Sequence, residues 1–144
     1  MPLHCKFMNY RLFVATKAFI IFRGKVLILR ESTKYQDGAN WGRYDVPGGR
    51  IKPGQKFDQS LKREVKEETN LKIKILKPFF VSEWRPKVKG ENWQIIGVFF
   101  ICQAMTDKVK LSKDHNHFLW IKPKDYKKYN LIPNLIKIFK AYLE

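Results

Sequence analysis

The sequence predicts an α/β fold in which a mixed β-sheet lies between helices on both of its faces. Runs of aromatic and β-branched residues, typical of strands, alternate with two segments whose apolar residues recur at helical spacing. The chain has 144 residues, of which 44% are hydrophobic and 15% aromatic, enough to fill one core of ordinary size. We therefore expect residues 1–144 to form a single domain.

The first strands are expected to form a β-hairpin over residues 12–29, with its turn at Gly24. The polar segment ESTKYQDGANWGR follows, and its composition is typical of a loop that reaches over a binding site. A short strand over residues 44–47 then leads into a pair of glycines.

The first helix is indicated by Phe57, Leu61 and Val65, which recur at i, i+4 and i+8 and so form one apolar stripe. Asn70 follows the last turn of this stripe. Asparagine is the usual second choice after glycine at the left-handed residue that ends a helix, so we expect the helix to end there.

The second half of the chain is expected to contain three further strands and a closing helix. Residues 71–84 show a strand pattern, and Gly90 marks the turn of the charged loop that follows. The apolar run 93–104 indicates a strand in the middle of a sheet, and residues 117–121 indicate another short strand. Pro133 is a typical first residue of a helix. The apolar face of that helix comprises Leu135, Ile138, Phe139 and Tyr142.

Charge is strongly biased, because 29 lysines and arginines face 13 acidic residues, for a formal net charge of +16. Such a bias is typical of proteins that bind nucleic acid, an anionic membrane or phosphorylated small molecules. It is equally typical of a solvated, lysine-rich surface, since the lysines are scattered and form no block. Both interpretations stay open on composition alone.

Cysteine usage and hydropathy indicate a reducing compartment and no membrane span. Cys5 and Cys102 are far apart and form no CxxC motif, so neither a disulfide framework nor a zinc site is expected. The apolar stretch LFVATKAFIIF is interrupted by Lys17, is too short to span a bilayer and is followed by no cleavage site. We expect a cytoplasmic protein without a membrane partner.

Three carboxylates of the first helix, Glu64, Glu67 and Glu68, fall within about one quadrant of its surface at roughly 100° per residue. Converging oxygen ligands suit Mg²⁺ or Mn²⁺, which proteins bind through a few carboxylates and the phosphates of a substrate. The alternative is a solvated face on which Lys62 and Lys66 form ordinary i,i+4 ion pairs. From the helix alone, the solvated face is the more common outcome.

The context of these carboxylates favours the metal-binding interpretation. From Gly49 the sequence runs through five residues to Gln55, then seven residues, then REVKEETNL over residues 63–71. This resembles the signature of the Nudix hydrolases, which is Gly, five residues, Glu, seven residues and Arg-Glu-aliphatic-x-Glu-Glu-x-Gly-aliphatic. The hairpin at the start, the strand ending in PGG and the closing helix resemble the family too, so the likeness covers essentially the whole chain.

Two positions depart from the signature. Asn70 replaces the final glycine, which the left-handed helix end tolerates. Gln55 replaces a glutamate that, in the family, commonly pairs with the arginine matching Arg63 or supports the metal shell. Its amide can still accept a hydrogen bond from Arg63 but adds no negative charge.

The resemblance implies a Nudix-type α/β/α sandwich and a pyrophosphohydrolase that cleaves a nucleoside diphosphate linked to another group, X. In such an enzyme Mg²⁺ or Mn²⁺ neutralises developing charge and lowers the pKa of the attacking water. Matched to the family motif, the metal-binding carboxylates are Glu64, Glu67 and Glu68, one of which also orients or deprotonates the water. The same match assigns a metal-binding carbonyl to Gly49, close backbone approach to Gly48 and organisation of the loop to Arg63.

Further candidates lie outside the signature. Asp114 precedes Trp120 by six positions. The resemblance to the family implies an acidic residue at this spacing before a tryptophan, where it serves as a further metal ligand or base. An aspartate in a loop is also an ordinary turn residue. Arg30 ends the second hairpin strand, where relatives place a phosphate-contacting arginine and where ordinary surface arginines are also common. His117 is either a base contact or, more commonly, a hydrogen-bonded strand histidine.

Aromatic residues flank the loops expected to rim the cleft, where a ring can stack on a nucleobase with a gain of roughly 1–3 kcal/mol per base. We expect one or two of them to contact substrate and the rest to belong to the core. The candidates are Trp41, Tyr44, Trp84 and Trp93.

Three functions are compatible with these features. The favoured one is a metal-dependent pyrophosphohydrolase of a nucleoside triphosphate or nucleotide derivative. The high positive charge instead suits an RNA 5′-end pyrophosphohydrolase, which makes nucleic acid the second choice of partner. Gln55 suits a catalytically weak nucleotide-binding module, but such a module would normally lose the carboxylates that this chain retains. Base, sugar, X group and oligomeric state stay open.

Overall fold

The computed structural model describes residues 9–32 and 42–144, so Trp41 and Cys5 lie outside the described residues. Its strands are β1 (Tyr10–Phe22), β2 (Lys25–Glu31), β3 (Tyr44–Asp45), β4 (Gly48–Arg50), β5 (Ile73–Trp84), β6 (Lys87–Val88), β7 (Glu91–Ala104) and β8 (His115–Ile121). Its helices are α2 (Phe57–Thr69), α3 (Pro133–Leu143) and the 3-10 helix η1 (Pro123–Lys128). The predicted elements are present, whereas η1 was not anticipated.

The strands form one eight-stranded mixed sheet whose main path is β3-β2-β1-β7-β5. β1 and β7 run parallel along most of their length, and the other pairs are antiparallel. The apolar strand β7 lies between β1 and β5, so its predicted position in the middle of the sheet is confirmed. The short strand β4 pairs with β1, while β8 pairs with β2.

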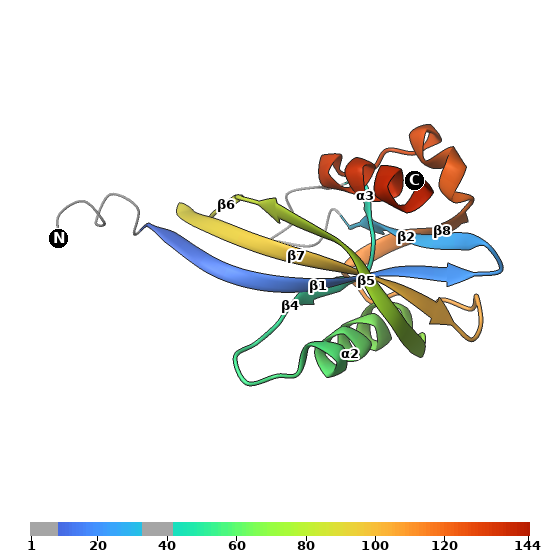
Figure 1. Cartoon of the computed structure of the whole chain (residues 1–144), viewed down its shortest axis with the longest axis horizontal. Coiled ribbons are helices and arrows are strands. Elements are labelled where there is room, and N and C mark those ends of the chain that lie inside the picture. The colour runs from blue at the N-terminus through green and yellow to red at the C-terminus, as the bar shows by residue number, and fades with distance from the viewer. Residues whose placement is uncertain (1–8, 33–41) are drawn as a thin grey trace.

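Helices cover both faces of the sheet, with α2 on one side and α3 with η1 on the other (Figure 1). Because successive side chains of a strand point to opposite faces, Ile20 packs in the cluster under α2 and Phe19 in the cluster under α3. Helix α2 contributes Leu61 and Val65 to the first cluster. Helix α3 contributes Leu135, Ile138 and Phe139 to the second cluster. The predicted α/β fold class is confirmed.

Helix α2 ends where the sequence predicts. Asn70 adopts a left-handed conformation with φ of 63°, and its amide donates to the Lys66 carbonyl at 2.9 Å. Phe57 differs from the expected stripe, since it is 50% exposed and stacks on Phe100 with ring centroids 5.4 Å apart. It lies in the first turn of α2, where half of its surface stays exposed.

Cys102 is a free, fully buried thiol on β7, and burial raises its pKa to about 12. It therefore behaves as a small hydrophobic residue, as expected. No helix in the described part of the chain is long and apolar enough to cross a membrane.

Candidate functional site

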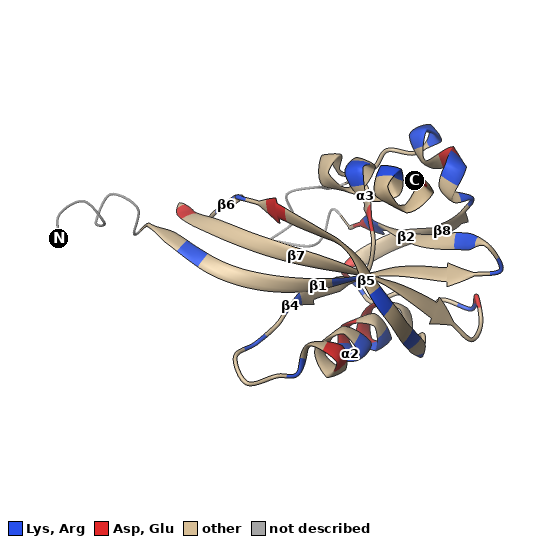
Figure 2. Ribbon diagram, in the orientation of Figure 1, with Lys and Arg blue, Asp and Glu red and all other residues tan. Residues whose placement is uncertain are grey.

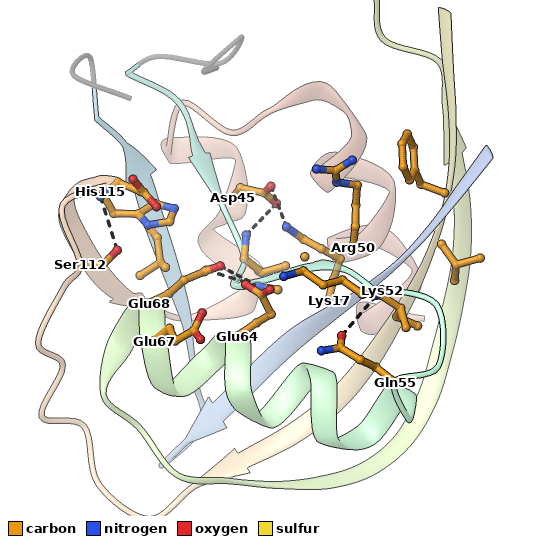
Figure 3. Close-up of a pocket in the computed structure, with 18 of the residues that line it drawn as sticks. Lys17, Asp45, Arg50, Lys52, Gln55, Glu64, Glu67, Glu68, Ser112 and His115 are labelled. Atoms are coloured by element: carbon orange, nitrogen blue, oxygen red, sulfur yellow. Dashed lines mark hydrogen bonds and ion pairs between the residues drawn. The ribbon is translucent and has the colours of Figure 1, made fainter. Parts of the chain in front are cut away.

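The main cleft of the molecule encloses about 1000 Å³ and brings together several parts of the chain (Figure 3). Helix α2 contributes its carboxylates, β4 its glycines, and β1 its first half. The segment that leads into β8 contributes Ser112, Asp114 and His115. All three signature carboxylates, Gly48, Gly49 and Asp114 therefore line one cleft.

Strand β4 packs directly against α2, and glycine permits this approach. A Cβ atom on Gly49 would lie 3.1 Å from the Glu64 carboxyl carbon, so any larger residue would displace that carboxylate. Gly48 has φ of 138°, a conformation that side-chain-bearing residues rarely adopt, and a Cβ there would overlap the Thr16 carbonyl oxygen. Its amide points at the Glu68 carboxylate with long contacts of 3.4 and 3.5 Å.

The Glu68 side chain is half-buried, and its pKa is raised to about 8. Burial is the main cause, and it is opposed by the charge of Lys17 and reinforced by the neighbouring charge of Glu64. The protein alone thus leaves this carboxylate short of positive charge. A cation in the cleft would supply that charge, so the site fits a bound metal ion.

Lys17 is the cation already present among these acids. Its Nζ lies 3.1 Å from Oδ2 of Asp45. Burial lowers the pKa of Lys17, but the charges of Asp45, Glu68 and Glu64 outweigh this, and the net pKa is raised. Lys17 therefore stays protonated inside the cleft. Sequence reasoning missed this pair, because only the interruption of an apolar strand by a lysine hinted at it.

Arg63 binds the carboxylates of its own helix. Its Nη1 lies 3.0 Å from Glu67 and its Nη2 lies 3.3 Å from Glu64. The Gln55 side chain instead accepts a 3.2 Å hydrogen bond from the Lys52 amide. Among the described residues, the hydrogen bonds of Arg63 go to Glu64 and Glu67. Arg63 thereby orients two candidate metal ligands, while Gln55 organises the loop between β4 and α2.

Backbone hydrogen bonds hold the segment that carries Asp114 against α2 and the residue after β2. The Ser112 amide donates to the Glu68 carbonyl at 3.2 Å, and the Ser32 amide donates to the Asp114 carbonyl at 2.9 Å. His115, which follows, lines the cleft with a buried Nδ1 that has no partner among the described residues. Burial and then the charge of Lys17 lower its pKa. Nothing in the sequence signalled His115.

Tyr44 and Arg30 are among the predicted site residues that lie outside this cleft. Tyr44 is 8% exposed, belongs to the apolar core and shares a 2.8 Å hydrogen bond between its hydroxyl and Nδ1 of His117. Arg30 donates to Asn116 at 2.9 Å, and its guanidinium lies 6.0 Å from the Tyr44 ring centroid. Both residues therefore make contacts within the protein.

Trp84 lines a second, smaller cavity of about 380 Å³ beside the start of α3. Lys17 and Asp45 line this cavity as well as the main cleft, so the pair separates the two spaces. Trp93 packs on Phe13 with ring centroids 4.6 Å apart.

The oxygen donors that face the main cleft suit Mg²⁺ or Mn²⁺, which prefer carboxylate and carbonyl ligands. Within residues 9–32 and 42–144, no three acidic, histidine or cysteine side chains are already gathered closely enough to hold an ion. The fit therefore rests on the chemistry of the donors and on their position around one cleft. The side-chain donors are Glu64, Glu67, Glu68 and Asp114, and Gly49 lines the same cleft.

Comparisons with known proteins agree with this geometry. The sequence model of the NUDIX domain matches residues 12–142. The chain is 27% identical over 97 residues to the nucleoside triphosphatase NudI of Escherichia coli K12, an alignment that covers 62% of this chain and 69% of that protein. Two solved structures share the fold. The MutT protein of Methanosarcina mazei Go1 has a TM-score of 0.78 at 23% identity and 92% coverage of each chain. The MutT NUDIX hydrolase of Burkholderia pseudomallei has a TM-score of 0.75 at 17% identity, with 91% of this chain and 98% of that chain covered.

Proposed function

The chain belongs to the Nudix hydrolase family, and on this premise we propose that it hydrolyses the pyrophosphate linkage of nucleoside triphosphates in a metal-dependent reaction. The observation that carries the proposal is that the Glu64 carboxylate lies so near Gly49 that a Cβ atom there would crowd it, in a cleft that also holds Glu67, Glu68 and Asp114. NudI, a nucleoside triphosphatase, supports triphosphates as the first substrates to test. We further propose that residues 1–144 form one Nudix domain, since the family match spans nearly all of them.

The metal proposed here is Mg²⁺ or Mn²⁺, held by Glu64, Glu67, Glu68, Asp114 and the Gly49 carbonyl. When bound, such an ion neutralises charge that develops on the phosphates and lowers the pKa of water. Arg63 orients Glu64 and Glu67 from outside the cleft through its two ion pairs. One of these carboxylates also orients or deprotonates the attacking water.

Substrate contacts are proposed on both sides of the Lys17–Asp45 pair. Lys17 is largely buried, stays charged and lines both cavities, so it can attract a phosphate oxygen there. Gly48 gives the phosphates close access to the backbone. Trp84, in the smaller cavity, is our candidate for stacking on the base. Arg30 and Tyr44 are engaged with other residues, so we assign them no contact.

Two alternatives are kept because particular residues favour them. An RNA 5′-end substrate is favoured by the formal charge of +16. A weak binding module is favoured by Gln55, which lacks the charge of the family glutamate. The free thiol of Cys102 fits a reducing compartment, so a cytoplasmic location remains part of the proposal.

The test is a hydrolysis screen of nucleoside tri- and diphosphate derivatives with saturating Mg²⁺ or Mn²⁺. Glu67→Gln and Glu68→Gln should each lower turnover by orders of magnitude while the circular dichroism spectrum is unchanged. Glu83→Gln is the matched control, because Glu83 is an exposed carboxylate outside the cleft. Near-normal turnover in both cleft variants would refute the assignment.

Salt dependence separates free nucleotides from RNA. Long-range steering of a small polyphosphate is screened over about 8 Å at physiological ionic strength, so kcat/KM should fall modestly with NaCl. A 5′-triphosphorylated RNA releases a counterion for each neutralised phosphate, which steepens the decline. If the RNA is the better substrate at low salt and its kcat/KM falls many-fold more steeply, the RNA function replaces the first proposal.

A further inference from the structure

A second charged region lies in the main cleft, next to the carboxylates but of opposite sign. The Arg50 guanidinium lies 4.5 Å from the ring centroid of Phe13 and 4.6 Å from that of Trp93. Within the described part of the chain, Arg50 takes part in none of the ion pairs. It is therefore a positioned cation whose charge no carboxylate compensates.

The aromatic residues that hold Arg50 are themselves fixed. The Trp93 indole N–H donates to Glu91 at 3.2 Å, and the same carboxylate pairs with Arg11 at 3.1 Å. Arg11 lines the cleft as well, but Glu91 neutralises it. Arg11 and Arg50 therefore differ in charge compensation. Arg11 forms an ion pair with Glu91, whereas Arg50 forms none among the described residues and can pair with an anionic ligand.

Arg50 is close to the proposed reaction site because it lies on β4, next to Gly49. Gly49, which touches Glu64, precedes Arg50 directly, so their Cα atoms are about 3.8 Å apart. Neighbouring residues of a strand face opposite sides of the sheet, which places Arg50 on the face of Phe13 and Trp93. Figure 3 shows Arg50 and the carboxylates of α2 around the same cleft. The same cleft is therefore lined by the acidic side chains of α2 and by the basic side chain of Arg50.

We propose that Arg50 binds a phosphate or carboxylate of the substrate that lies beyond the hydrolysed linkage, so that the enzyme selects substrates with a further anionic group. The ring faces hold the guanidinium without using its N–H groups, which remain available as a planar fork for an anion. The inference rests on the proposed function for the reaction itself. The anion has two possible sources, the terminal phosphate of a nucleoside triphosphate or a charged X group.

The test compares Arg50→Gln with the matched control Arg11→Gln. Two substrate pairs are assayed for kcat/KM: a nucleoside triphosphate against its diphosphate, and a nucleoside diphosphate linked to a hexuronate against the same nucleotide linked to a neutral hexose. Arg50→Gln should lower kcat/KM roughly tenfold or more for the member with the extra anion and little for its neutral counterpart. The pair that responds identifies the source, and Arg11→Gln should change neither ratio. An equal loss on all four substrates, or no loss on any, overturns the proposal.

Binding of inorganic tripolyphosphate to the metal-free protein provides a readout that does not need catalysis. Calorimetry should show roughly tenfold weaker binding for Arg50→Gln and unchanged binding for Arg11→Gln. If the wild-type protein hydrolyses no nucleotide yet binds tripolyphosphate through Arg50, the proposed function fails and the anion site stands. If nucleotides are hydrolysed but neither assay depends on Arg50, the anion site fails alone. Should Arg50→Gln unfold, Arg50→Lys replaces it, with a smaller loss expected because lysine keeps the charge but not the planar fork.

Discussion

The backbone amide of Ser112 donates a 3.2 Å hydrogen bond to the backbone carbonyl of Glu68. A second bond, from the Lys110 amide to the Thr69 carbonyl at 3.0 Å, runs beside it. These bonds satisfy carbonyls at the C-terminal end of α2, which have no partner within the helix. They also fix the segment before Asp114 against the helix that carries the other carboxylates. Asp114 therefore enters the cleft by backbone pairing between distant parts of the sequence.

Asp114→Asn is expected to weaken Mg²⁺ binding and to lower turnover about 10- to 100-fold, the usual effect of altering a metal ligand or its immediate support. Mn²⁺ binding followed by electron paramagnetic resonance measures the first effect, and nucleotide hydrolysis the second. Asp107→Asn is the control, since Asp107 is exposed and lies in the same segment but outside the cleft. Equal effects of the two substitutions would contradict a role for Asp114 in the site.

The two glycines of β4 should respond differently to alanine. Gly48→Ala forces a side chain onto φ of 138° and against the Thr16 carbonyl, so we expect a loss of about 3 kcal/mol or more in the free energy of unfolding. In Gly49→Ala the new methyl meets only the end of the Glu64 side chain, which can rotate away. Stability should then change by less than about 1 kcal/mol, while activity falls by up to about a hundredfold because Glu64 is displaced. Urea denaturation and hydrolysis assays separate the two effects.

The stability of the metal-free protein should depend on pH through Glu68. Its carboxyl pKa is about 8 in the folded state against an ordinary 4.5, so between these values the folded protein keeps a proton that the unfolded chain has lost. The free energy of unfolding should therefore decrease as pH rises through this window and level off above it. Glu68→Gln should remove this slope. Thermal melts in EDTA from pH 5 to 9 provide the measurement, and an unchanged slope in the variant would contradict the assignment.

Mg²⁺ should oppose that loss of stability. A metal ion binds the deprotonated carboxylate, so the increase in Tm on adding Mg²⁺ should grow as pH rises from 6 to 9. In Glu68→Gln the increase should be small at every pH. A wild-type increase in Tm that is independent of pH would show that Glu68 does not exchange its proton for the metal.

Asn70 provides a test of the helix end that is separate from catalysis. Its left-handed φ of 63° costs an alanine about 1–2 kcal/mol, whereas glycine adopts it freely. Asn70→Ala should therefore destabilise the protein by about that amount, and Asn70→Gly should leave it equally or slightly more stable. Hydrolysis should be unaffected in Asn70→Gly, since Asn70 lies outside the cleft. Guanidinium denaturation curves measure the free energy of unfolding of the two variants. Equal values for Asn70→Ala and Asn70→Gly would contradict this role of the left-handed residue.

Gln55→Glu restores the family residue and should tighten Mg²⁺ binding or leave activity unchanged. A carboxylate can still accept the hydrogen bond from the Lys52 amide that Gln55 accepts at 3.2 Å. The added charge also lies in the same cleft as Lys52 and Arg50, which attract it. A marked fall in kcat, measured at saturating Mg²⁺, would indicate that the loop depends on a neutral amide.

Local patterns in the sequence were sufficient for the two α-helices, for the long strands and for the three carboxylates at the centre of the site. The i, i+4, i+8 stripe and the left-handed preference of Asn70 define α2, because a helix is governed by contacts within a few residues. The apolar run of β7 predicted a central strand for a similar reason, since a strand covered on both faces carries few polar side chains. The signature spacing placed Glu64, Glu67 and Glu68 together on one helix.

Tertiary structure decided which distant residues complete the cleft. Three contacts join residues that are far apart in the sequence: Lys17 with Asp45, Ser112 with Glu68, and Arg50 with Trp93. They form because the strands pair in one register and the helices pack on one face each. No local periodicity encodes those registers, and a shift by one residue would turn every side chain of a strand to the opposite face. For the same reason Tyr44, expected at the rim, belongs to the core: its environment is set by β8 and α3, which follow it much later in the chain.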